Sequence, residues 1–162
     1  KGLYYTWLVK KYTKVCLGGT FDQLHIGHKS LLEMAFSTSN EVIIGLTSDQ
    51  RANLGRANEV LHKYEERYSN LDDFLASNFS EKYSIVKLND IWGPGIFDKD
   101  LEAIIVSEET ENVAFELNKN RKLKNLSELE VITVPLILAK DGKKISSTRI
   151  RNNEIDVDGF QA

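Results

Sequence analysis

Two of the three histidines in the chain, His25 and His28, lie close together beside a pair of glycines. They belong to the stretch GGTFDQLHIGH, which begins at Gly18. Imidazole N–H groups and the Thr20 hydroxyl donate hydrogen bonds, and glycines let a ligand approach the backbone closely. A helix beginning near Gly27 would add unpaired backbone N–H groups, which favour phosphate. The stretch therefore predicts a phosphate site; the alternative is a glycine turn whose histidines only cap a helix.

A second group of polar residues occurs in ISSTRIR, residues 145–151. Ser146, Ser147 and Thr148 offer hydroxyls at an expected helix start, where backbone N–H groups are also unpaired. Arg151 follows one turn later, and its planar guanidinium can bind oxyanions in a bidentate manner. A well-capped helix with a basic, solvated face is the alternative. Two helix starts at one edge of a sheet would suit the two ends of a polyphosphate.

Apolar runs alternate with amphipathic segments along the chain, which is typical of a parallel sheet with helices on its faces. We therefore predict a doubly wound α/β sheet with right-handed crossovers and ligands at the carboxyl ends of the strands. The polar run 50–63 has no clear period and predicts a mobile loop that orders over bound substrate. The expected strands are residues 14–19, 41–49, 83–89, 103–107 and 129–138, and the expected helices are 27–39, 64–79, 112–123 and 146–155.

Composition narrows the classes of protein further. Hydrophobic residues make up 41% and charged residues 28% of the chain, so one globular domain over residues 1–162 is expected. The formal charge of −3 gives no global field that would attract nucleic acid. No apolar run approaches the roughly 18 residues needed to cross a membrane. The single cysteine, Cys16, fits a reducing, cytoplasmic location, and a start at Lys1 leaves open a fragment of a longer chain.

Both polar stretches resemble signatures of one superfamily. GGTFDQLHIGH is similar to the T/HxGH signature of the nucleotidyltransferases, and ISSTRIR to their ISSTxxR signature. The resemblance covers nearly all of residues 14–159. Within the superfamily, GLTSDQ, YEER, IIVSEET and VPLILAKDGKKISSTRIR resemble phosphopantetheine adenylyltransferase of the archaeal and eukaryotic type. This resemblance implies a Rossmann-like fold, and transfer of an adenylyl group from ATP to 4′-phosphopantetheine, giving dephospho-coenzyme A and pyrophosphate in coenzyme A biosynthesis.

The resemblance also implies roles for individual residues. His28 would donate to the α-phosphate as charge builds, His25 would support the phosphate tail, and Thr20 would orient the attacking phosphate. Ser147, Thr148 and Arg151 would hold the β- and γ-phosphates, and residues 107–110 would frame the adenine. Magnesium would ride on ATP oxygens, with no metal site built by the protein. The implied catalytic residues are His28, His25, Thr20 and Arg151; the nucleotide-binding residues are Gly18, Gly19, Thr20, Phe21, His25, His28, Ser107, Glu108, Ser146, Ser147, Thr148 and Arg151; the acceptor-binding residues are Thr20, Lys63 and Arg121.

Two loop positions depart from the family pattern, since Gln23 and Glu108 stand where proline is common. A cytidylyltransferase acting on a phosphorylated alcohol is one alternative, but IIVSEETEN does not match the RTEGIS type of run expected there. A non-catalytic nucleotide-binding domain is another, and the intact histidines argue against it. A class I aminoacyl-tRNA synthetase shares HIGH, yet this chain is short and lacks a KMSKS-like run. The sequence predicts nothing about the oligomeric state.

Overall fold

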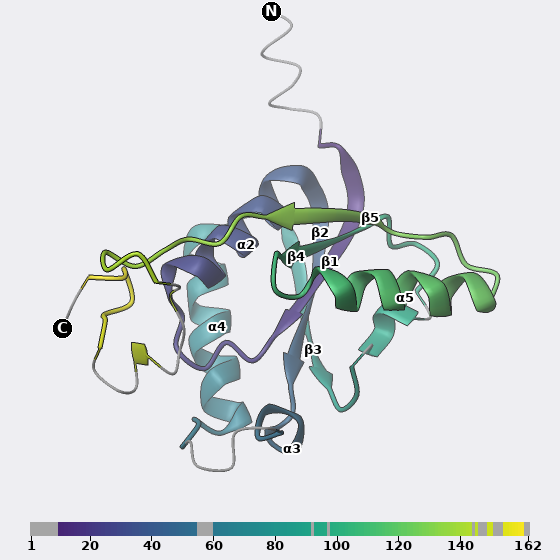
Figure 1. Cartoon of the computed structure of the whole chain (residues 1–162). Coiled ribbons are helices and arrows are strands. Elements are labelled where there is room, and N and C mark those ends of the chain that lie inside the picture. The colour runs from purple at the N-terminus through teal and green to yellow at the C-terminus, as the bar shows by residue number, and fades with distance from the viewer. Residues whose placement is uncertain are drawn as a thin grey trace, which may run out of the picture.

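Five parallel strands form the centre of the computed structural model, which describes residues 10–54, 60–91, 93–96, 98–143, 145, 149–150 and 154–160. The strands are β1 (Tyr12–Gly19), β2 (Ser39–Thr47), β3 (Lys82–Leu88), β4 (Ala103–Ser107) and β5 (Glu130–Val134), in the order β3-β2-β1-β4-β5. Because parallel neighbours cannot be joined by a tight turn, each connection returns across a face of the sheet. The predicted doubly wound parallel sheet is confirmed (Figure 1).

Helices cover both faces of the sheet, as the sequence predicts. Helices α2 (Ile26–Thr38) and α4 (Tyr64–Asn78) pack on one face, and α5 (Glu111–Leu123) lies beside β4 and β5 on the other (Figure 1). Successive side chains of a strand point to opposite faces. Thus Val15 and Leu17 join the core beneath α2 and α4, whereas Cys16 joins the smaller cluster beneath α5. Both clusters remove apolar surface from water, which is the main force holding these layers together.

The predicted elements differ from the observed ones mainly at their ends. Strand β5 stops at Val134, because Pro135 has no N–H to donate to a ladder. The polar run 50–63, predicted as a loop, contains most of a short helix, α3 (Asp49–Ala52). This helix shows no apolar period because Ala52 is its only buried residue. Of the predicted last helix, residues 149–150 are helical, and its other described residues, 154–155, are not.

The carboxyl ends of all five strands meet at one edge of the sheet. The chain passes from β1 to β2 on one side, and later returns to place β4 on the other side of β1. The strand order therefore reverses between β1 and β4, where a parallel sheet leaves a crevice for ligands. Among the described residues, no helix is long and apolar enough to span a membrane.

Candidate active site

The two histidines of GGTFDQLHIGH form a reciprocal cap at the start of α2. His25 is the N-cap residue, and its Nδ1 accepts the backbone N–H of Gly27 at 3.1 Å and that of His28 at 3.4 Å. In return, His28 Nδ1 accepts the backbone N–H of His25 at 3.4 Å. The two rings stack with centroids 3.7 Å apart and an interplanar angle of 18°. This arrangement fixes both imidazoles in one orientation, directly after the end of β1.

The cap also determines the tautomer of each ring. A backbone N–H can only donate, so the Nδ1 atom that accepts it carries no proton. In the neutral form the proton must then lie on Nε2 of both rings. Burial lowers the pKa of His25 to about 4 and that of His28 to about 3; the neighbouring His25 further lowers the pKa of His28, and a backbone contact with Gln23 opposes the shift. At neutral pH both histidines are therefore uncharged Nε2–H donors.

The backbone amides at the start of α2 are engaged rather than free. The Ile26 N–H donates to the Val157 carbonyl at 2.9 Å, and the next two amides go to His25 Nδ1. The sequence-based expectation that unpaired amides of this helix bind phosphate is wrong for these three groups. Since the imidazoles take up the amides at Nδ1 and keep a proton at Nε2, the rings become the donors at this helix start. Capping and phosphate binding are thus compatible roles for the same histidines.

The turn between β1 and α2 holds Thr20 and Phe21 in different surroundings. Phe21 adopts a left-handed backbone conformation with φ of 48°, and its side chain is buried in the core, with its ring centroid 5.0 Å from that of His28. The Phe21 ring therefore packs against the His28 ring and limits its movement. A Cβ at Gly19 would lie 3.0 Å from the Phe21 ring, so any larger residue there would have to displace that ring slightly. The Thr20 hydroxyl accepts a hydrogen bond from Thr47 Oγ1 at 3.1 Å.

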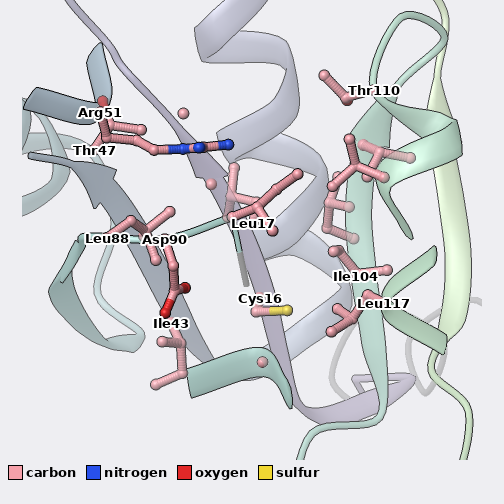
Figure 2. A pocket seen from close by; sticks show the side chains of 18 residues that line it. Cys16, Leu17, Ile43, Thr47, Arg51, Leu88, Asp90, Ile104, Thr110 and Leu117 are labelled. Carbon is pink, nitrogen blue, oxygen red and sulfur yellow. The ribbon is translucent and has the colours of Figure 1, made fainter. Parts of the chain in front are cut away.

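A cavity opens at the carboxyl ends of β1, β2 and β4 and continues along the sheet face towards the residues after β3 (Figure 2). Gly18 and Gly19 border it, as predicted for the close approach of a ligand. Its inner walls are apolar and include Cys16 and Ile104. Burial raises the pKa of the Cys16 thiol to about 12, so this cysteine is an inert wall residue at neutral pH.

Arg51 is a cavity residue that the sequence patterns did not indicate. Figure 2 shows its side chain reaching from α3 towards the centre of the cavity. The backbone N–H of Arg51 donates to Ser48 Oγ at 3.2 Å, which ends the preceding strand and starts α3. Within the part of the chain that the structure describes, the guanidinium has no hydrogen-bond or ion-pair partner. An unpaired cation facing a cavity is available for an anionic ligand. A polar, aperiodic run concealed this residue in the sequence.

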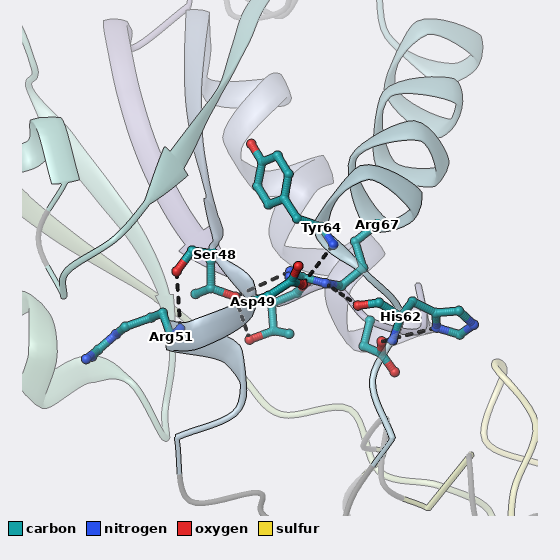
Figure 3. Close-up of polar contacts among 9 residues, drawn as sticks. Ser48, Asp49, Arg51, His62, Tyr64 and Arg67 are labelled. Atoms are coloured by element: carbon teal, nitrogen blue, oxygen red, sulfur yellow. Dashed lines mark hydrogen bonds and ion pairs between the residues drawn. The ribbon is translucent and has the colours of Figure 1, made fainter.

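Lys63 follows a segment that is held against the end of β1. Asp22, which is only 4% exposed, accepts the backbone N–H of His62 at 2.8 Å and lies 3.1 Å from His62 Nδ1. On the other side of Lys63, the Tyr64 N–H donates to Asp49 Oδ1 at 2.8 Å (Figure 3). The Lys63 side chain is exposed. The structure thus holds the backbone on both sides of Lys63, through Asp22 and Asp49, and the contact of its side chain with substrate stays a prediction.

The second signature approaches the first through its own apolar residues and those on either side of it. Ile145 and Ile155 form a buried cluster with Ala139, and Ile26 and Ile150 pack against that cluster. Ile26 directly follows His25, so the C-terminal segment lies against the start of α2. Ser146, Ser147, Thr148 and Arg151 themselves lie outside the described residues. The nucleotide binding expected of all four, and the β- and γ-phosphate contacts expected of the last three, stay predictions.

Arg121 does not lie at this site, contrary to the sequence-based expectation that it meets the acceptor. Its side chain is fully buried, with Nε donating to the Ser127 carbonyl at 2.8 Å and Nη1 to the carbonyls of Gly95 and Asp98 at 2.6 and 2.9 Å. Asp98 in turn pairs with Lys14, near the amino end of β1. Because α5 runs back from the carboxyl edge, its last turn lies towards the amino ends of the strands, where Arg121 holds loop carbonyls. One of these carbonyls belongs to Gly95, which lines the cavity, but the guanidinium itself does not line it.

The turn after β4 was expected to frame the adenine base. Ser107 is engaged within this turn, since its N–H donates to Thr110 Oγ1 at 3.1 Å and its carbonyl accepts the Thr110 N–H at 3.1 Å. Glu108 is exposed and accepts the Leu136 N–H at 3.3 Å. Val106 and Thr110 line the cavity. Recognition of adenine by Ser107 and Glu108 therefore stays a prediction.

Comparisons with known proteins show the family to which this chain belongs. A family model described as cytidylyltransferase-like matches residues 16–153. The phosphopantetheine adenylyltransferase of Methanothermobacter thermautotrophicus is 42% identical over 147 residues, which cover 91% of this chain and 88% of that protein. The corresponding protein of Pyrococcus horikoshii is 44% identical over 148 residues, covering 91% and 94%. The chain belongs to the phosphopantetheine adenylyltransferase family. The chain is therefore a nucleotidyltransferase.

Solved structures are consistent with this family and its fold. An Archaeoglobus fulgidus protein of unknown function superposes with a TM-score of 0.66 at 30% identity, covering 75% of this chain and 89% of that chain. A tyrosyl-tRNA synthetase from the same organism superposes with a TM-score of 0.58 at 14% identity, covering 91% of this chain and 62% of that one. The second likeness concerns the fold alone.

Proposed function

We propose that this protein transfers the adenylyl group of ATP to 4′-phosphopantetheine, which yields dephospho-coenzyme A and pyrophosphate. The observation that carries the proposal is the pair of neutral, mutually capped histidines in the turn after β1, in a member of the phosphopantetheine adenylyltransferase family. The last two residues of β1, Gly18 and Gly19, line the cavity. An oxygen of the acceptor phosphate forms a bond to the α-phosphorus, and the bond from that phosphorus to the bridging oxygen of pyrophosphate breaks. A phosphate acceptor is ionised at neutral pH, so no strong general base is needed.

The histidines supply donors for the charge that develops in this step. Nε2–H of His28 would donate to the α-phosphate, and Nε2–H of His25 to the phosphate tail. Because both rings are held by the backbone before substrate arrives, they need not reorganise in the transition state. Uncharged donors also avoid the cost of burying two positive charges 3.7 Å apart.

The acceptor phosphate would be held by Thr20, Lys63 and Arg51. Arg51 takes the place that the sequence assigned to Arg121, since its unpaired guanidinium faces the cavity. The apolar wall formed by Cys16, Ile43 and Ile104 would accommodate the pantetheine arm, which extends towards the loop after β3.

Magnesium would enter this site with ATP. Among the described residues, no three His, Cys, Asp or Glu side chains come together to hold a metal ion. The ion would neutralise phosphate charge from oxygens of the nucleotide. His25, His28 and Arg51 bring donors to the phosphates from the protein side.

The test is a competition among nucleotides and acceptors. The protein is supplied with ATP or CTP and with phosphopantetheine, pantetheine, glycerol phosphate or nicotinamide mononucleotide, and products are identified by mass. We expect dephospho-coenzyme A from ATP and phosphopantetheine alone. A dominant product from CTP or from another phosphorylated acceptor would contradict the proposal, and equal use of unphosphorylated pantetheine would contradict the acceptor-phosphate site.

A further inference from the structure

Arg67 is a fully buried arginine that the mechanism above does not use. Its side chain is 0% exposed, so every donor must be satisfied within the protein. Nε donates to the His62 carbonyl at 3.0 Å, and Nη2 pairs with Asp49 Oδ1 at 3.1 Å (Figure 3). These two contacts tie the start of α4 to α3. The remaining nitrogen, Nη1, lies towards the sheet.

Nη1 joins the carboxyl ends of two neighbouring strands. It donates to the Thr20 carbonyl at 3.0 Å and to Thr47 Oγ1 at 3.4 Å. Thr47 is the last residue of β2, and Thr20 directly follows β1. Thr47 also lines the cavity, and so does Gly19, the residue before Thr20. The guanidinium thus lies behind the wall against which a phosphate would dock.

The hydrogen bonds run in one direction. A guanidinium has donors and no acceptor, so Thr47 Oγ1 must accept from Arg67. Thr47 Oγ1 then donates to Thr20 Oγ1 at 3.1 Å. A phosphate oxygen of an ionised acceptor can only accept, so a useful Thr20 hydroxyl must donate. A chain that begins at a buried positive charge and passes through Thr47 favours that orientation and polarises each hydroxyl in turn.

We propose that Arg67 is a positioning residue for Thr20, holding its carbonyl directly and its hydroxyl through Thr47. The inference rests on the proposed function, in which Thr20 orients the acceptor phosphate. Arg67 touches no reacting atom, and it acts on the reaction only through the two threonines.

The test removes one hydroxyl while leaving the guanidinium in place. Thr47→Val has nearly the same shape and cannot relay a hydrogen bond. We expect it to lower kcat/KM for phosphopantetheine about tenfold, the scale of one hydrogen bond, with KM for ATP changed less than about twofold. Thr47→Ser restores the hydroxyl and should recover most of the loss. Thr38→Val is the matched control, because its hydroxyl bonds the Met34 carbonyl at the end of α2, far from the cavity.

A double-mutant cycle places the effect at Thr20. If Thr47 acts through Thr20, then Thr20→Val with Thr47→Val should be no slower than Thr20→Val alone. A Thr47→Val protein with the wild-type kcat/KM, or a further tenfold loss in the double variant, would overturn the inference. Loss of melting temperature without a change in kcat/KM would do the same, since that is the result of a purely structural brace.

The experiments distinguish a failure of this inference from a failure of the proposed function. If the wild-type protein makes dephospho-coenzyme A and Thr47→Val does so equally well, the relay fails and the function stands. If the wild-type protein prefers another phosphorylated acceptor and Thr47→Val loses activity towards it, the function fails and the relay stands. If no phosphorylated acceptor reacts, both are overturned.

Discussion

The imidazole of His25 lies so close to Gly27 that position 27 has no room for a side chain. A Cβ there would lie 2.9 Å from Cε1 and 3.0 Å from Nδ1 of His25. Nδ1 is also the atom that accepts the N–H groups of Gly27 and His28. The glycine between the two histidines is thus required by the cap itself, because any larger residue would push away the ring that ends the helix.

Gly27→Ala should separate activity from stability. Displacing the His25 ring removes the helix cap and lowers the free energy of unfolding by about 1 kcal/mol. Alanine has a higher helix propensity than glycine, which raises the free energy of unfolding by a comparable amount. We therefore expect a melting temperature close to that of the wild type, and a kcat about a hundredfold lower because both imidazoles lose their orientation. Steady-state kinetics and thermal unfolding measure the two effects.

Gly142→Ala is the matched glycine substitution for this test. Gly142 has a φ of 80° with nothing near its Cβ position, so alanine there is strained by about 1 kcal/mol without a clash. It should lower the melting temperature and spare kcat. If Gly27→Ala retained full kcat, the proposed orientation of the histidines would be wrong.

His28→Ala should impair the chemical step more than nucleotide binding. Removal of one transition-state donor costs at least about a hundredfold in kcat, whereas the affinity for ATP depends on many contacts and should fall much less. Single-turnover kinetics and calorimetric titration with ATP distinguish the two quantities. A variant that turns over like the wild type would remove His28 from the mechanism.

Stability should fall as the pH drops below the ordinary range of histidine. Burial lowers the pKa of His25 to about 4 and that of His28 to about 3, from an ordinary value of 6.5. The unfolded chain therefore takes up protons at higher pH than the folded protein. The contribution of the two neutral histidines to the free energy of unfolding is then fully present above pH 6.5, and it declines as the pH falls towards 4.

Urea unfolding at a series of pH values measures this decline. His25→Asn keeps a side-chain acceptor at the N-cap and removes one titrating group, so its dependence on pH should be weaker. In NMR spectra, the Cε1 protons of His25 and His28 should shift only below about pH 5. Titration of either ring near 6.5 would show that burial does not hold the imidazoles neutral.

Arg51→Met should weaken binding of the acceptor and leave binding of the nucleotide unaffected. The variant keeps the length of the side chain and loses the unpaired cation in the cavity. We expect KM for phosphopantetheine to rise at least about tenfold, as for the loss of a charge-assisted contact, with KM for ATP little changed. Arg51→Lys should recover only part of the loss, because an ammonium lacks the planar fork.

Arg121→Lys provides the contrast. This substitution disturbs the carbonyls of Ser127, Gly95 and Asp98, so it should lower the melting temperature. It should not change KM for phosphopantetheine, since the Arg121 guanidinium does not line the cavity. If Arg121→Lys raised KM for phosphopantetheine and Arg51→Met did not, Arg121 and not Arg51 would be the residue that binds the acceptor.

Local patterns in the sequence were sufficient for the layers of the fold. Continuous apolar runs such as 41–49 are typical of a strand with both faces buried, and glycines after the run 14–17 mark the end of the first strand. The same reasoning located the histidine turn, because a strand, a glycine pair and a helix start are consecutive in the chain. Errors occurred where no period exists, as in α3, whose only buried residue is Ala52.

The partners of charged groups were decided by tertiary structure. Arg51, Arg67 and Arg121 are equally charged in the sequence, yet one faces a cavity, one lies behind the threonines, and one holds loop carbonyls towards the amino ends of the strands. Which of these occurs depends on the direction in which each helix leaves the sheet and on the segments packed beside it. Short-range patterns determine what a residue can do; long-range packing determines the groups that it meets, because those groups come from distant parts of the chain.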